Sequence, residues 1–247
     1  ACIHAITSKQ PIFSLAWWKQ GQYLIEGGFR APSDIIIRQW NHHDYTSKDH
    51  GTLVRTLKGH KYAVCALFVD ELKDQLLSCS DDKTIRLWDL NTGEQLKQFN
   101  GHTNSVNGMC RVSSSVIVSA CSDKMIKFWN MENDACMHSI DNAHSDSIYA
   151  LLYSASNQVL ISASRDCTVK VWEVKMGEED KCALKFTIAS PFDTCCWSLA
   201  FLEGENDGST VLVGDNFGNI FTIDLKTGTC INKVKAHSKM IWKLAVA

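Results

Sequence analysis

Residues Gly59 to Leu90 have the sequence GHKYAVCALFVDELKDQLLSCSDDKTIRLWDL, and two later segments, 101–131 and 143–174, repeat its pattern. Each copy contains a histidine, a serine, a turn aspartate and a tryptophan in that order. The serine precedes the aspartate by 4 positions and the aspartate precedes the tryptophan by 6 in all three copies, while the histidine precedes the tryptophan by 28, 27 and 28. Because four residue types stay in register, the sequence predicts a repeat protein.

The composition bounds the class of protein. The 247 residues are 45% hydrophobic and 21% charged with three prolines, which predicts a globular chain. A formal charge of -2 gives no general attraction to nucleic acid or anionic membranes. No apolar run reaches the roughly 18 residues of a membrane helix, so no membrane insertion is expected. The chain opens with ACIH, without the pattern of a secretory signal, and we expect an intracellular protein, cytoplasmic or nuclear.

The cysteine count is high, at eleven, but the cysteines lie mostly inside predicted strands. We expect them to be reduced thiols that serve as small apolar residues. No CxxC motif occurs, and no histidine and cysteine cluster has zinc spacing. The sequence therefore predicts no metal and no cofactor.

Two further units carry the pattern incompletely. Residues 11–40 contain three strand-like runs and end in Trp40, but Gly-His is missing and Arg30 stands at the serine position. In the last unit Phe217 replaces the turn aspartate and Ile223 replaces the tryptophan. The period-2 alternation and the turn residues between the runs are typical of an all-β protein.

By these residues the chain resembles the WD-repeat family of β-propellers, whose repeats carry Gly-His, a central Ser or Thr, a turn Asp and a closing Trp-Asp. The resemblance covers essentially the whole chain. It implies an all-β fold of four-stranded antiparallel blades in a single β-propeller domain, residues 1–247. In this family each repeat supplies the outer strand of one blade and the three inner strands of the next. The expected repeats are 7–51, 52–93, 94–134, 135–182 and 183–228, with a partial repeat at 229–247.

Both ends of the sequence carry part of a unit. Residues 1–6 resemble the strand that follows each tryptophan, and the last residues restart the pattern at His237 and give one strand. Five recognisable repeats with partial strands at both ends do not close a propeller, and open strand edges invite pairing with other chains. We therefore expect a segment of a longer protein, with seven blades in the parent and six as the alternative.

The resemblance also implies a buried hydrogen-bonded network in each regular blade. The indole N–H only donates, a hydroxyl accepts from it and donates to a histidine nitrogen, and the second imidazole nitrogen reaches the turn carboxylate. Loss of one member leaves the others unsatisfied at a cost of about 1–3 kcal/mol. The first and fifth units lack members of the set, so we expect apolar packing to hold those blades. The expected sets are His60, Ser78, Asp82 and Trp88; His102, Ser119, Asp123 and Trp129; and His144, Ser162, Asp166 and Trp172.

The same residue types also occur in hydrolase triads, but the roles do not fit. Each set recurs once per blade, its hydroxyl is committed to the indole, and no Gly-x-Ser-x-Gly elbow is present. Phosphate-binding glycine loops are missing as well. The sequence therefore predicts no enzyme and no small-molecule substrate.

The candidate binding residues occupy two positions that the family directs toward the wider end of the central channel. One follows the apolar anchor of the innermost strand and is aromatic in four of six cases, and the other precedes the turn aspartate or its counterpart. Exposed aromatic rings with an occasional arginine anchor protein contacts. The alternative is that some of these rings plug the channel or pack between blades. The candidates are Phe13, Asp81, Asn107, Tyr149, Arg165, Trp197, Asn216 and Trp242.

These features predict a non-catalytic scaffold that binds a partner peptide or protein. Arg165 stands nearly alone, whereas a phosphorylated ligand needs clustered arginines, so an apolar or cationic peptide fits better. Nucleic acid is not expected, because the lysines near the end of the chain are offset by acidic residues. Those lysines are Lys233, Lys235, Lys239 and Lys243, and the acids are Glu203, Glu205 and Asp207. Two alternatives stay open: a substrate-receptor module of a ubiquitin ligase, and a targeting domain of a larger enzyme such as a kinase.

Overall fold

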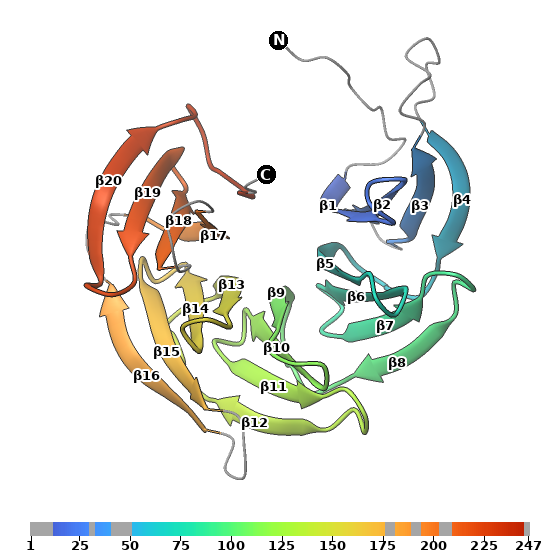
Figure 1. Cartoon of the computed structure of the whole chain (residues 1–247), viewed down its shortest axis with the longest axis horizontal. Helices are drawn as coiled ribbons and strands as arrows, with labels where there is room; N and C mark the ends of the chain where they lie inside the picture. The colour runs from blue at the N-terminus through green and yellow to red at the C-terminus, as the bar shows by residue number, and fades with distance from the viewer. Residues whose placement is uncertain are drawn as a thin grey trace. The chain divides into compact units, whose positions relative to one another are not determined.

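The computed structural model describes residues 12–29, 33–40, 51–175, 181–188, 194–202 and 209–244, without the side chains of residues 40, 51 and 181. This part of the chain is all-β and forms five four-stranded antiparallel sheets, each with its strands in chain order (Figure 1). We call the sheets blades 1 to 5. The chain divides into two compact units, residues 1–106 and 107–247, and each is described by itself. Among the described residues no helix is long and apolar enough to cross a membrane.

The first unit contains blades 1 and 2. Blade 1 comprises β1 (Ile12–Trp18), β2 (Tyr23–Gly28), β3 (Ile35–Trp40) and β4 (Gly51–Leu57). Blade 2 comprises β5 (Val64–Asp70), β6 (Gln75–Ser80), β7 (Ile85–Asp89) and β8 (Gln95–Phe99). The two blades share one apolar core that includes Ile25, Ile37, Val64 and Trp88.

The second unit contains blades 3 to 5, except that β9 begins at the last residue of the first unit. Blade 3 comprises β9 (Val106–Arg111), β10 (Val116–Cys121), β11 (Ile126–Asn130) and β12 (Cys136–Ile140). Blade 4 comprises β13 (Ile148–Ser154), β14 (Val159–Ser164), β15 (Val169–Lys175) and β16 (Lys181–Ile188). Blade 5 comprises β17 (Cys196–Phe201), β18 (Thr210–Asp215), β19 (Asn219–Asp224) and β20 (Thr229–Lys235).

Burial on both faces explains the composition of the second strand in each regular blade. All six residues of β10 and of β14 are buried, and their sequences are VIVSAC and VLISAS. A strand covered on both sides must be apolar or small throughout rather than alternating. Blades 4 and 5 then share a core that includes Ile161, Val171, Val213 and Phe221. The buried cysteines and serines of these strands are therefore small core residues, and the described cysteines are free thiols.

A buried chain of hydrogen bonds crosses blade 2. The Trp88 indole N–H donates to Ser78 Oγ at 2.8 Å, and Ser78 Oγ lies 2.7 Å from His60 Nε2. His60 Nδ1 lies 2.8 Å from Asp82 Oδ2. Since the indole can only donate and an ionised carboxylate can only accept, the serine hydroxyl donates to Nε2 and Nδ1–H donates to the aspartate. The main-chain N–H of Thr84 also donates to Asp82, which closes the turn.

Blade 4 repeats this arrangement with nearly the same geometry. Trp172 donates to Ser162 Oγ at 2.9 Å, Ser162 Oγ lies 2.7 Å from His144 Nε2, and His144 Nδ1 lies 2.9 Å from Asp166 Oδ2. In blade 3 the Trp129 indole donates to Ser119 at 2.8 Å. The histidine of that set, His102, belongs to the other unit, so its part in the third network stays a prediction.

Burial sets the protonation states of these networks. Burial lowers the pKa of His60 and of His144, although the neighbouring carboxylate opposes this. For Asp82 and Asp166 burial acts to raise the pKa, but hydrogen bonds from the histidine and from a threonine outweigh it and hold the pKa well below its usual range. The folded protein therefore keeps a neutral imidazole beside an ionised carboxylate.

The apolar packing expected in blades 1 and 5 is present, and each of these blades also contains buried polar groups that differ from the network. In blade 1, Arg38 Nε donates to the fully buried Glu26 at 3.0 Å. In blade 5, Asp215 is 1% exposed and accepts the N–H of Asn219 at 2.7 Å and of Phe217 at 2.9 Å. In both blades the buried carboxylate has hydrogen-bond donors within its own blade, as a buried charge requires.

The segment after β20 occupies the place of a further innermost strand. Ser198 Oγ donates to the carbonyl of Ile241 at 3.3 Å, just as Ser14 Oγ donates to the carbonyl of Val64, the first residue of β5. The sequence predicts a strand after His237. Up to residue 244 the structure assigns no strand there and no pairing to another strand, so that prediction is wrong for the described residues.

Replacement of Trp88 by phenylalanine tests the blade 2 network. Trp88→Phe keeps an aromatic ring but removes the donor to Ser78, so the free energy of unfolding should fall by about 1–3 kcal/mol. Urea denaturation at neutral pH measures it, with Trp242→Phe as the control because that indole is exposed. Equal unfolding free energies for the two variants would contradict the network.

The buried histidines predict a pH dependence. In the unfolded chain they titrate near about pH 6.5, whereas burial lowers their pKa in the folded protein. The unfolded chain therefore binds more protons, and stability is fully present above about pH 6.5 and falls as the pH drops below it. We expect Tm to decrease from about pH 7.5 to about pH 5.5, before the carboxylates titrate near about pH 4.

Removal of the titrating groups is the control for this prediction. The variant His60→Asn/His144→Asn should be less stable at every pH and should show a flatter Tm profile over the same window. A slope equal to that of the unaltered protein would show that other groups cause the pH dependence.

Candidate functional site

A β-bulge lies in the innermost strand of four blades, and in three of them it holds a candidate residue. In blades 1, 2, 4 and 5 the register between the first and second strands skips one residue. An extra residue of this kind is left out of the ladder and its side chain is redirected. The skipped residues are Phe13, Cys65, Tyr149 and Trp197, all at the position that the sequence singles out.

Three rings form what we call the aromatic cluster: Tyr149, Trp197 and Trp242, all in the second unit. Tyr149 stacks on Trp197 with ring centroids 3.8 Å apart and an angle of 12° between planes. Trp242, from the segment after β20, lies tilted against Trp197 at 5.1 Å and 59°. Trp242 is 55% exposed, so the cluster offers a large apolar surface to solvent. The Tyr149 and Trp197 rings also join blades 4 and 5, which is the packing role named above as the alternative.

The Trp197 indole nitrogen is buried and has no hydrogen-bond partner in the described part of the chain. A buried donor without an acceptor costs free energy, because the water that it loses is not replaced.

Arg165 lies beside the aromatic cluster. Its guanidinium faces the Tyr149 hydroxyl and forms an ion pair with Asp146, Nε to Oδ2 at 3.7 Å. The two side chains are 59% and 45% exposed, and an ion pair this open to water contributes little to stability. Burial raises the pKa of Tyr149, against the opposing charge of Arg165, so the hydroxyl stays protonated. Arg165 is therefore available to a partner.

The other candidates divide between the two units and between different roles. In the first unit, Phe13 is partly exposed and stacks on Phe29 with ring centroids 5.6 Å apart. In the same unit, Asp81 accepts a hydrogen bond from the thiol of Cys65, with Sγ 3.2 Å from Oδ1. Asn107 in the second unit donates to the carbonyl of Ile148 at 2.8 Å and to a serine of its own blade, so it links blades 3 and 4. Its amide is committed inside the protein.

The turn between β18 and β19 holds the remaining candidate, Asn216, and an exposed aromatic residue that was not among the predicted binding residues. Asn216 is half-buried in this turn. Its neighbour Phe217 is 56% exposed, because Asp215 takes over the polar role of the turn aspartate and leaves the Phe217 side chain outside. The spacing from Asp215 to Asn219, an acid and an amide across a four-residue turn, is the signal that could have indicated this.

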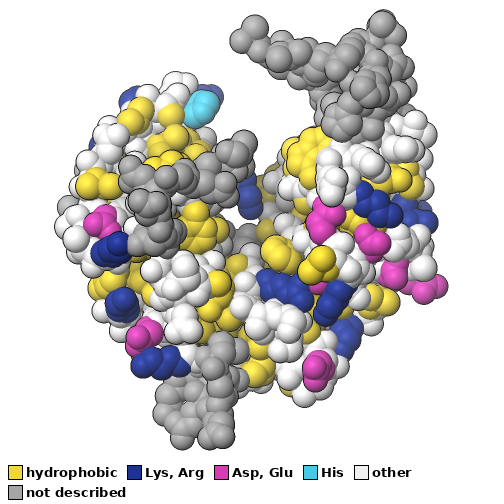
Figure 2. All heavy atoms as spheres, viewed as in Figure 1, with side chains coloured by type: hydrophobic (Ala, Val, Ile, Leu, Met, Phe, Trp, Pro, Cys, Tyr) yellow, Lys and Arg dark blue, Asp and Glu magenta, His cyan; other side chains and the backbone are white. Residues whose placement is uncertain are grey.

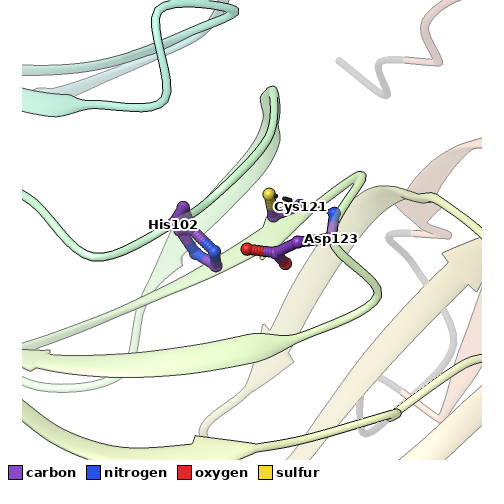
Figure 3. Close-up of side chains that lie close together, drawn as sticks. All are labelled: His102, Cys121 and Asp123. Carbon is purple, nitrogen blue, oxygen red and sulfur yellow. Dashed lines mark hydrogen bonds between the residues drawn. The ribbon is translucent and has the colours of Figure 1, made fainter.

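Figure 3 draws three side chains of metal-ligating types, His102, Cys121 and Asp123. His102 belongs to the first unit, so only the other two are described together. The Asp123 main-chain N–H donates to Cys121 Sγ at 3.3 Å. A structural zinc site needs four protein ligands, and this cysteine and carboxylate supply only two. The expectation of no metal stays a prediction.

Comparison with known proteins agrees with the repeat pattern. Three segments, 51–89, 93–130 and 135–173, match the family described as WD domain, G-beta repeat. The chain is 22% identical over 223 residues to autophagy-related protein 16 of Arabidopsis thaliana, which covers 88% of this chain and 42% of that protein. It is 27% identical over 223 residues to human striatin-3, with 66% of this chain and 27% of that protein covered.

A third relative is also matched over only part of its length. Nuclear distribution protein nudF of Aspergillus niger is 30% identical over 126 residues, which cover 49% of this chain and 28% of that protein. The chain thus spans less than half the length of these relatives. Each matched segment contains the outer strand of one sheet followed by the three inner strands of the next, and the segments 51–89 and 135–173 contain the networks of blades 2 and 4. The chain belongs to the WD-repeat family.

Proposed function

We propose that the chain is a non-catalytic scaffold that binds a segment of a partner protein at the aromatic cluster and Arg165. The observation that carries this is the cluster itself: two stacked rings and an exposed tryptophan beside a solvent-exposed guanidinium. Tryptophan, tyrosine and arginine supply most of the binding energy at protein interfaces.

The relatives support an interaction role inside the cell. Their names refer to autophagy, nuclear distribution and, for a yeast relative, pre-mRNA processing. Proteins of the WD-repeat family generally act as non-catalytic interaction modules. The histidine, serine and aspartate of blades 2 and 4 fit this role, because each serine hydroxyl is fully used between an indole and an imidazole.

The cluster also favours one kind of partner segment. Its exposed surface is mainly aromatic, and it offers a single guanidinium, that of Arg165. A phosphate would need several free arginines. We therefore propose a non-phosphorylated segment with an apolar anchor residue that packs against Trp242.

The double variant Trp242→Ala/Arg165→Ala tests this site. Both side chains are more than half exposed, so folding should be preserved, whereas truncation of two anchor residues should weaken partner binding at least about tenfold. The measurement is affinity capture from a eukaryotic lysate with mass spectrometry, followed by titration of the captured partner's peptides against the full chain. Leu72→Ala is the matched control, since Leu72 is 98% exposed in a turn of blade 2.

The outcome separates two locations for the binding surface. Loss of the same partners in the double variant, but not in the control, supports the aromatic cluster. An identical partner set and unchanged peptide affinities would contradict the proposal and leave the cluster as packing between blades.

A further inference from the structure

The turn between β18 and β19 carries a surface that we call the basic turn patch: Phe217, Lys235, His237 and Lys239. Phe217 is 56% exposed, and all three basic side chains are exposed as well. Figure 2 shows basic, histidine and hydrophobic side chains next to one another over the neighbouring ends of β19 and β20, at the upper left. None of these four residues belongs to the aromatic cluster.

Backbone contacts fix the patch in place. The N–H groups of Ala236 and His237 both donate to the carbonyl of Gly218, at 2.9 and 3.0 Å. The Lys235 ammonium donates to the carbonyl of Phe217. The chain runs so close to the turn that a Cβ on Gly218 would lie 2.2 Å from the His237 carbonyl oxygen and 2.5 Å from that of Lys239. The φ of Gly218 is +85°, so a glycine is needed there for two independent reasons.

The patch is positively charged although the chain as a whole carries a formal charge of -2. Residues 225–244 contain five lysines and one histidine but no aspartate or glutamate. The carbonyl that Lys235 contacts is neutral, so its charge is not cancelled. Lys239 and Lys243 take part in none of the ion pairs found among the described residues. The nearby carboxylate, Asp215, is buried and its oxygens accept hydrogen bonds from Phe217 and Asn219.

An exposed phenyl ring near lysines that form no ion pair among the described residues fits a ligand that is both acidic and apolar. We propose that the basic turn patch binds an acidic segment of a partner protein, with an apolar side chain against Phe217 and carboxylates toward Lys235, Lys239 and His237. Complementary charges of this kind fix orientation and raise the association rate, while the buried ring supplies affinity. A polyanion such as RNA fits less well, since the patch is short and the rest of the chain is net acidic.

Binding of a synthetic peptide to the full chain tests the proposal. The probe is a fluorescein-labelled peptide of about twelve residues in which aspartate and glutamate flank two leucines, at about 50 mM salt. Fluorescence anisotropy should give a Kd below about 1 mM that rises with salt. Lys239→Glu and Phe217→Ala should each weaken binding about tenfold.

Matched controls separate the patch from general charge and from the aromatic cluster. Lys185→Glu makes the same charge change on β16, and Leu72→Ala removes an even more exposed apolar side chain in the other unit. Both controls, and Trp242→Ala, should leave the peptide Kd within about twofold. The proposal is independent of the aromatic cluster, so it can fail while the proposed function stands.

Four results would overturn the proposal. They are the absence of peptide binding below about 1 mM, equal losses in the control variants, loss of binding only in Trp242→Ala, and tighter patch-dependent binding of oligouridylate RNA or of phosphatidylserine vesicles than of the peptide.

Discussion

The hydrogen-bonded chain from tryptophan through serine and histidine to aspartate is the constraint on which the regular blades depend. In blade 2 it joins Trp88 on the third strand, Ser78 on the second, His60 in the loop before the first and Asp82 in the turn. Each polar atom is buried and each has a partner, so the set stabilises only when complete. The lowered pKa of the histidine follows from the same burial and ties the network to neutral pH.

The blades without this network show what the fold permits. Glu26 with Arg38 and Asp215 with Asn219 satisfy buried charges by other pairings, while the strand order and the apolar core stay the same. In blade 5 the use of Asp215 in place of the turn aspartate also changes which side chain is exposed at the surface. Because Asp215 closes the turn, the position that holds an aspartate in the regular blades holds the exposed Phe217, around which the basic residues of the next segment gather.

Local periodicity made the strands predictable, but it did not indicate which residues form hydrogen bonds across different strands. The runs that end at Trp40, Trp88 and Trp172 are strands because alternation and turn residues act over a few positions. The roles of Asn107 and Asp215 depend instead on which strand lies opposite in space. Asn107 is bound to the carbonyl of Ile148, 41 residues away, which no local pattern indicates. The aromatic candidates at Tyr149, Trp197 and Trp242 could be anticipated because they occupy the same position of the repeat that the family resemblance directs toward the channel, but their mutual stacking could not.

The rigid blades explain how this chain could present both of the binding surfaces that we propose. The networks and cores fix the strands, and the bulges and turns then hold aromatic and charged side chains in defined places without contributing to the core. The most direct test of this account is the exchange of the tryptophan indole N–H protons with solvent, followed by NMR on the full chain with labelled tryptophan. We expect slow exchange for Trp88 and Trp172, which donate to buried serines, and fast exchange for the exposed Trp242. Fast exchange of Trp88 and Trp172 at neutral pH would contradict it, because the networks would then be open in solution.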